Sequence, residues 1–165
     1  MASEPKKLIE ATHFSPDTLE FIRLLEKHGV RYVIVGGEAV IFHGHARFTG
    51  DVDFFYSVDA ENAARLFAAL KEFWQGDIPG IRTQAELSQE GYVIQFGRPP
   101  NRIDLLTSAD GLTFEEAWET RMKVEIAGAG GLNTALLSIE KLIQNKRASG
   151  RPKDLDDLAF LEKRP

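Results

Sequence analysis

Two short stretches, Val35-Gly36-Gly37-Glu38-Ala39 and Thr49-Gly50-Asp51-Val52-Asp53-Phe54, carry the strongest signal in the sequence. Alternate residues of a strand point to the same face, so Asp51 and Asp53 would project together while the apolar residues between and after them pack beneath. Two carboxylates on one rigid strand resist joint ionisation unless a cation neutralises them. The second stretch therefore predicts a platform for a divalent metal ion. The glycine pair in the first predicts a place where phosphate can approach the backbone.

Composition limits the class of protein. A chain of 165 residues with 43% hydrophobic content suits a single domain with a real core. We see no apolar run that could span a bilayer and no hydrophobic leader, and the absence of cysteine excludes disulfides and fits a reducing compartment. We therefore expect a cytoplasmic protein with no membrane partner. A net charge of −5 argues against a broad nucleic-acid-coating surface, although it leaves a local basic patch open.

The order of apolar patterns predicts an α/β (α+β) fold, with a mixed β-sheet covered by helices. Ser15 before Pro16 is a good helix start and predicts an N-terminal helix over 15–29. Further helices are expected at 38–43, from Asp59 onward, and at 113–120, 134–146 and 153–161. Strands are expected at 31–35, 51–57, 92–96, 102–106 and 123–126, the third and fourth forming a hairpin around Arg98-Pro99-Pro100-Asn101. We expect one domain over 1–165, with a core over about 30–127, a loop over 77–90 and a C-terminal helical segment over 132–163.

Asp104 is a third candidate for the predicted metal site. It stands alone in the apolar run Arg102-Ile103-Asp104-Leu105-Leu106, whose isoleucine and leucine would turn to the opposite face. An isolated acid in a strand is often an exposed or edge residue, and that alternative applies here. Beside an Asp-x-Asp strand, however, Asp104 is the natural third carboxylate. Three hard oxygen donors favour Mg²⁺ or Mn²⁺.

Taken together, these motifs resemble the DNA polymerase β-like nucleotidyltransferase superfamily. The glycine pair, Asp51-Val52-Asp53 and Ile103-Asp104-Leu105 match its pattern in order. The stretch from Val35 through His43-Gly44 to Asp53, with Arg47 and Thr49, looks like the small branch of AbiEii-type toxin proteins and aminoglycoside and lincosamide nucleotidyltransferases. Lys146 and Gly150-Arg151-Pro152-Lys153-Asp154-Leu155 resemble the tail of that branch. The resemblance covers roughly residues 30–162 and implies the nucleotidyltransferase fold.

The resemblance also implies a reaction. In such enzymes the phosphates of an NTP lie over the glycine turn, and an acceptor hydroxyl attacks the α-phosphorus and expels pyrophosphate. Asp51 and Asp53 would bind two metal ions, and Asp104 would complete the acceptor-side site and take the acceptor proton. Gly36 and Gly37 would let backbone amides and the following helix N-terminus meet the triphosphate.

Basic residues would offset the triphosphate charge. Five cations and no acid lie between positions 141 and 153. The resemblance singles out Lys146 as a phosphate contact, helped by Arg151 or Lys153. The alternative for any of these residues is a solvated helix end, where cations are favoured in any case.

Other residues near the motifs have expected roles that are less specific. Arg47 could bind phosphate bidentately, and Thr49 could either assist or cap the turn into the aspartate strand. Gly37 stands where many superfamily members have serine, and Glu38 follows it. At the first turn of a helix we expect Glu38 to point away from the phosphates. Asp154, Asp156 and Asp157 are expected to form salt bridges rather than a second metal site.

Two classes of function remain open. The favoured one is a metal-dependent nucleotidyltransferase that moves an NMP group to a small molecule, a protein or an RNA end. The alternative is a non-catalytic binding module of the same fold, or a component of a toxin–antitoxin pair. Intact Asp51, Asp53 and Asp104 favour the enzyme. A chain this short could complete its acceptor cleft as a homodimer or with an antitoxin-like partner.

Overall fold

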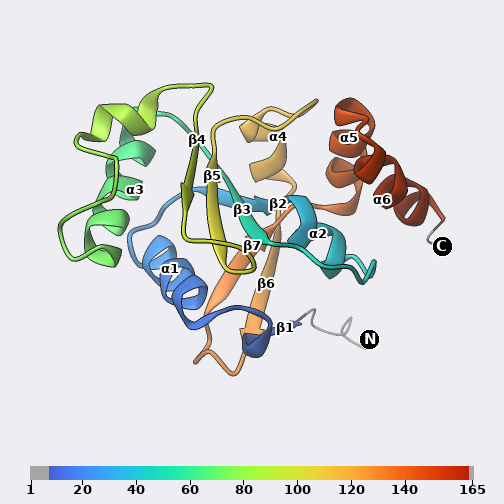
Figure 1. Ribbon diagram of the computed structural model, residues 1–165, viewed down its shortest axis with the longest axis horizontal. Helices are drawn as coiled ribbons and strands as arrows, with labels where there is room; N and C mark the ends of the chain where they lie inside the picture. The colour runs from blue at the N-terminus through green and yellow to red at the C-terminus, as the bar shows by residue number, and fades with distance from the viewer. Residues whose placement is uncertain (1–7, 164–165) are drawn as a thin grey trace.

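The structure, a computed structural model that describes residues 8–163, is a mixed α/β fold around one sheet (Figure 1). The strands of that sheet are β1 (Leu8–Glu10), β2 (Tyr32–Val35), β3 (Asp51–Tyr56), β4 (Val93–Phe96), β5 (Arg102–Leu106), β6 (Met122–Ala127) and β7 (Asn133–Leu136). The helices are α1 (Pro16–Lys27), α2 (Gly36–Phe42), α3 (Ala60–Phe73), α4 (Phe114–Glu119), α5 (Ile139–Ser149) and α6 (Pro152–Glu162), with 3₁₀ turns η1 (Ala11–His13) and η2 (Gln84–Ser88). The predicted fold class is confirmed.

The sheet is mixed, and its order is β1-β6-β7-β2-β3-β5-β4. β2 runs antiparallel to β3, β3 runs parallel to β5, and β4 and β5 form the predicted antiparallel hairpin. In the parallel pair Asp53 stands opposite Asp104, and Asp51 stands opposite Arg102. Partners in a ladder point to the same face, so this register brings polar side chains from two distant segments together.

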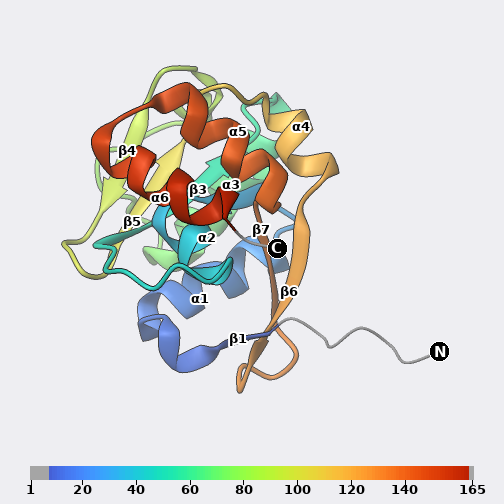
Figure 2. The same ribbon diagram turned by 90° about the vertical axis from the view of Figure 1, so that its right-hand side faces the viewer.

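Helices cover both faces of the sheet (Figures 1 and 2). On one face α1 and α3 pack on a large apolar cluster that includes Phe21, Leu66 and Phe54. On the other face α2, α4, α5 and α6 enclose a smaller cluster that includes Val35 and Phe55. Because side chains alternate along β3, the aspartates share the second face, beside the smaller cluster.

Several helix starts follow from their capping residues. The Ser15 side chain accepts a hydrogen bond from Thr18 N at 3.1 Å, and Asp59 Oδ1 accepts one from Asn62 N at 2.8 Å. Thr113 and Glu116 form a capping box at the start of α4. The predicted starts of these helices are confirmed. Within residues 8–163, none of the helices is long and apolar enough to cross a bilayer.

The predicted helix over 134–146 is wrong at its beginning. Asn133–Leu136 is strand β7, which lies between β6 and β2 and pairs with both. The helix begins at Ile139, because the Ser138 side chain caps it by accepting from Lys141 N at 3.3 Å. β1 was not predicted, η2 lies inside the segment predicted as a loop, and α2 begins at Gly36 rather than at residue 38.

Candidate active site

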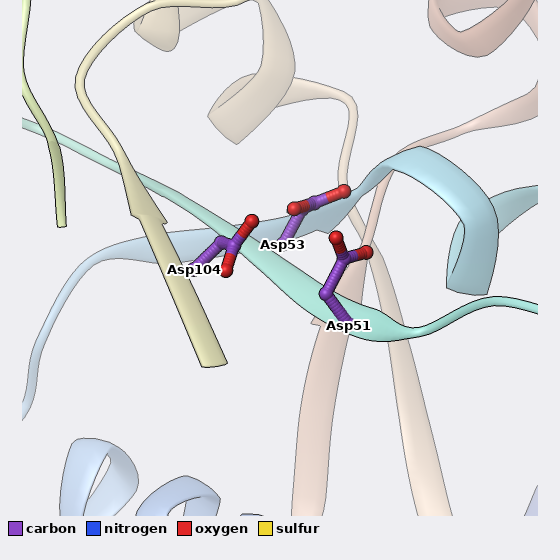
Figure 3. Close-up of side chains that lie close together, drawn as sticks. All are labelled: Asp51, Asp53 and Asp104. Carbon is purple, nitrogen blue, oxygen red and sulfur yellow. The ribbon is translucent and has the colours of Figure 1, made fainter. Parts of the chain in front are cut away.

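Three aspartates meet on one face of the sheet. Asp51 and Asp53 come from β3 and Asp104 from β5, where the register sets Asp53 directly opposite Asp104. One carboxylate oxygen from each residue lies within 4.8 Å of the other two. Figure 3 shows the three side chains converging from the two strands. The fold therefore brings together the three carboxylates that the sequence singled out.

The donor set fits a hard divalent cation. All three side chains offer carboxylate oxygens, which Mg²⁺ and Mn²⁺ prefer over nitrogen or sulfur. Asp104 is buried, while Asp51 and Asp53 are half-buried. A cation held here would keep open positions on the exposed side, where a substrate oxygen or water could bind.

The neighbouring carboxylates and burial change the ionisation of Asp53. Burial, and then the charges of Asp51 and Asp104, raise the pKa of Asp53 from 3.8 to about 7. A hydrogen bond with Asp104 also raises this pKa, whereas the charge of Arg102 lowers it. A carboxyl group with a pKa near neutrality gives up its proton when a divalent cation binds, so metal binding here is expected to release a proton.

Arg102 is a site residue that the sequence analysis missed. Its Nη2 donates to Asp51 Oδ2 at 2.7 Å and to Asp104 Oδ2 at 3.0 Å, and its Nε donates to Asp104 Oδ1 at 2.8 Å. One guanidinium thus bridges two of the three carboxylates. Its position two residues before Asp104 was the available signal, because strand residues at that spacing share a face.

The glycine turn is packed against the carboxylates. Gly36 has φ +66°, and a Cβ atom there would lie 2.1 Å from Asp53 Oδ2. A Cβ atom at Gly37 would lie 2.6 Å from Thr49 Oγ1. Neither position has room for a side chain, so the backbone of the turn, half-buried at Gly36 and buried at Gly37, lies directly beside the aspartates.

One cavity of about 370 Å³ unites the predicted site. Its lining includes every residue named above for catalysis, metal binding or phosphate binding: Gly36, Gly37, Arg47, Thr49, Asp51, Asp53, Asp104, Lys146 and Arg151. Arg102, Lys153 and Asp154 line it as well. Residues from α2 to α6 therefore meet around one hollow.

Arg47 and Thr49 already have partners in this structure. Arg47 Nε and Nη2 donate to the two carboxylate oxygens of Asp157 at 2.9 and 3.0 Å, a bidentate pair between the loop before β3 and α6. Thr49 Oγ1 donates to the Asp51 backbone oxygen at 3.2 Å, as expected for a residue that caps the turn into β3. Arg47 thus makes the fork-like contact expected of it, but with a carboxylate rather than a phosphate.

Lys146 is buried and holds α5 against α6. Its Nζ lies 2.9 Å from Asp154 Oδ1 and 3.2 Å from Asp157 Oδ2. Burial alone would raise the pKa of Asp154, but hydrogen bonds from Lys146, Ser149 and Arg151 hold it well below its usual range. The salt bridges predicted for Asp154 and Asp157 are confirmed, whereas the one predicted for Asp156 is wrong, because Asp156 is exposed and has no ion pair within residues 8–163.

Arg151 and Glu38 differ in how they face the site. The Arg151 side chain is 76% exposed and donates to Asp154 Oδ2 at 2.9 Å, so it can move toward a ligand at little cost.

Glu38 is buried at the first turn of α2, contacts His13 Nε2, and lines a different cavity. Its carboxylate therefore points away from the aspartates, as predicted.

Comparison with known families agrees with this geometry. A model of the family described as "Nucleotidyltransferase of unknown function (DUF6036)" matches residues 17–161. No curated protein matches the chain. The matched segment contains the glycine turn, all three aspartates and both C-terminal helices.

Proposed function

We propose that this chain, which belongs to the nucleotidyltransferase family of that model, is a metal-dependent enzyme that transfers an NMP group from an NTP to a hydroxyl acceptor. In the proposed reaction the acceptor oxygen bonds to the α-phosphorus, the bond from that phosphorus to the β-phosphate oxygen breaks, and pyrophosphate leaves. The observation that carries the proposal is the in-register pair Asp53 and Asp104 beside Asp51, next to a turn that excludes side chains.

The carboxylates have assigned roles in this proposal. Asp51, Asp53 and Asp104 would hold Mg²⁺ or Mn²⁺, which supplies charge neutralisation for the phosphates when bound. Asp104, the most buried of the three, would accept the proton of the acceptor hydroxyl. Arg102 would offset part of the charge of Asp51 and Asp104 before the cation binds and would then have to yield some of its contacts to that cation.

The phosphates would lie against the rest of the cavity. The backbone of Gly36 and Gly37 would approach them most closely, because no Cβ atom intervenes. Arg151, with its exposed guanidinium, is the cation best placed to move onto a phosphate. Arg47, Thr49 and Lys146 would contribute from positions that their present hydrogen bonds already fix, with Arg47 and Lys146 sharing their charge with Asp157.

The narrower assignments are also proposals. We assign the chain as one domain over 1–165, although residues 1–7 and 164–165 lie outside the part that the structure describes. We place it in the small AbiEii-type branch on its motifs, with a homodimer or an antitoxin-like partner as candidates to complete the acceptor cleft. The alternative is a non-catalytic binding module, which one contact favours: Arg102 already pairs with Asp51 and Asp104.

Binding of an NTP gives the first test. Isothermal titration with each NTP in Mg²⁺ is expected to show binding by the wild type and none by Asp51→Asn or Asp53→Asn, with their thermal unfolding preserved. Asp156→Asn is the matched control, because Asp156 is exposed and has no ion pair among the described residues. Equal NTP affinity in all four proteins would contradict the assigned site.

Transfer and the identity of the acceptor need a second experiment. Each α-labelled NTP is incubated with the protein, Mg²⁺ and cell extract, and the label is then sought in RNA, protein and small molecules. Label in one pool identifies the acceptor class and supports the enzyme. No label in any pool, with NTP binding retained, would favour the binding module, and transfer retained by both aspartate variants would overturn the assigned site.

A further inference from the structure

A second cavity, of about 410 Å³, lies at the opposite end of β2 from the aspartates. Tyr32, at the start of β2, lines it, whereas Val35, at the end of β2, pairs with Asp53. The two positions are three residues apart along the strand, which is roughly 10 Å. The two cavities share no lining residue, so this one is independent of the proposed active site.

The lining of this cavity is basic, in a chain whose net charge is −5. It contains Arg31, Arg65, Arg121 and Lys123, with Glu26 as its one carboxylate. Its volume falls within the range of about 300–1,000 Å³ that is typical of small-molecule sites. Charge and size together indicate an anionic small molecule.

The four cations differ in whether a carboxylate of the protein already pairs with them. Arg31 Nη2 lies 2.6 Å from Asp59 Oδ2, and Arg65 is paired with Glu61. By contrast, neither Arg121 nor Lys123 forms an ion pair with a carboxylate of residues 8–163. These two positive charges are therefore available to a ligand.

Arg121 is also held in place before any ligand arrives. Its Nη1 donates to the Trp118 backbone oxygen at 2.7 Å, and its guanidinium carbon lies 3.5 Å from the centroid of the Trp118 indole. A guanidinium carries five N–H donors, so most of them remain unused. Fixing the group in advance reduces the entropy that binding would otherwise lose.

The floor of the cavity consists of polar groups that are bonded to one another. The Tyr32 hydroxyl is buried and donates to Glu26 Oε1 at 2.8 Å, and it lies 2.9 Å from Thr134 Oγ1. Glu26 is thereby held at the floor. The Tyr32 proton is committed to Glu26 and leaves Thr134 to donate to the Tyr32 oxygen, so neither hydroxyl offers a proton to an anion. The unpaired cations come from the segment between α4 and β6 and from β6 itself, so an anion would be held by Arg121 and Lys123.

We propose that this cavity binds a small phosphate-bearing molecule, with Arg121 and Lys123 contacting the phosphate oxygens beside Trp118. A guanidinium matches the geometry of phosphate bidentately, and an ammonium adds a compact charge next to it. Because the site is separate from the aspartates and needs no metal, it does not depend on the proposed transfer reaction.

The indole N–H resonances of the two tryptophans test this directly. Trp118 lines the cavity, while Trp74 packs against Phe73 and Phe96 elsewhere and serves as an internal reference. ¹⁵N-labelled protein in EDTA is titrated separately with inorganic phosphate, pyrophosphate and AMP, and Trp118→Phe assigns the signals. We expect a saturable shift of the Trp118 indole and of the Arg121 and Lys123 amides, with the Trp74 indole unmoved.

Variants and ligands separate the outcomes. Lys123→Gln, which leaves the Trp118 contacts untouched, is expected to weaken binding at least about tenfold, while Arg82→Gln, the same charge change outside the cavity, is expected to have no effect. A response to phosphate and pyrophosphate alone identifies an inorganic ligand, and an added response to AMP identifies a nucleotide. The proposal is overturned by the absence of saturable shifts, by shifts confined to the aspartate cavity, by equal affinity in Lys123→Gln, or by equal binding of acetate.

Discussion

Arg102 donates to Asp51 at 2.7 Å across the register pair that joins β3 to β5. The same guanidinium holds Asp104, so one cation spans two of the three carboxylates. This pairing offsets part of the negative charge that the three carboxylates place on one face of the sheet. It also means that any cation bound by the aspartates must compete with Arg102.

Arg102→Gln is expected to raise the pKa of Asp53 above its value of about 7, because the Arg102 charge lowers that pKa. The measurement is ¹³C NMR titration of the aspartate carboxyl groups in EDTA. Arg98→Gln removes an exposed charge from the nearby hairpin turn and is the control. An unchanged Asp53 titration in Arg102→Gln would show that the guanidinium does not act on this carboxyl group.

Without metal, the folded protein is expected to lose stability as pH rises from about 4 to about 7 through Asp53. Its pKa is raised from 3.8 to about 7, so between these values the folded state keeps a proton that the unfolded chain has released. The contribution of Asp53 to the free energy of unfolding falls by at most about 1.4 kcal/mol per pH unit, and it levels off above the pKa that Asp53 has in the folded protein. Urea unfolding in EDTA across this range, compared with Asp53→Asn, measures it. Parallel pH profiles for the two proteins would rule the effect out.

Gly36→Ala is expected to destabilise the fold more than Gly29→Ala. Both glycines have φ +66°, so both substitutions introduce the same left-handed strain, about 1–2 kcal/mol. A Cβ atom at Gly29 has nothing within 4 Å, whereas at Gly36 it would lie 2.1 Å from Asp53 Oδ2. Denaturant midpoints measure the difference. Equal losses would mean that Asp53 moves aside freely and that the close contact has no energetic weight.

Lys146→Met is expected to lower the free energy of unfolding by about 3–5 kcal/mol, because Asp154 and Asp157 would stay buried without their shared ammonium. Lys153→Met changes the same charge at an exposed residue of the same cavity and should alter stability by no more than about 0.5 kcal/mol. Chemical denaturation of both variants at pH 7 provides the comparison. Similar stabilities would show that Lys146 is free to leave its carboxylates.

Local sequence signals predicted much of the fold. The capping residues Ser15 and Asp59 placed α1 and α3, and the alternation in β3 put its two aspartates on one face. The predicted helix from 134 was wrong because β7 has only four residues, Asn133-Thr134-Ala135-Leu136, and a strand this short shows no period that distinguishes it from the start of a helix. The cap at Ser138 was the missed signal for the true helix start.

The residues of the candidate site were predicted only in part, because local spacing relates residues on one strand but not residues on separate elements. Residues on one strand share a face by spacing, which related Asp51 to Asp53 and should have added Arg102 to Asp104. The partner of Arg47 depends instead on how α6 docks against the loop before β3, and the partners of Lys146 depend on how α6 docks against α5. Arg47 and Asp157 are 110 residues apart, and nothing in the local pattern relates them.

The fate of the label from two forms of one NTP tests the central claim most directly. The protein is incubated with Mg²⁺, an acceptor source and the same NTP labelled at either its α- or its γ-phosphate. The account predicts that the α-label enters the acceptor and that the γ-label leaves in pyrophosphate. Neither the transfer nor the release is expected in Asp53→Asn or in EDTA. Transfer of the γ-label to the acceptor, or α-label transfer that persists in Asp53→Asn, would contradict it.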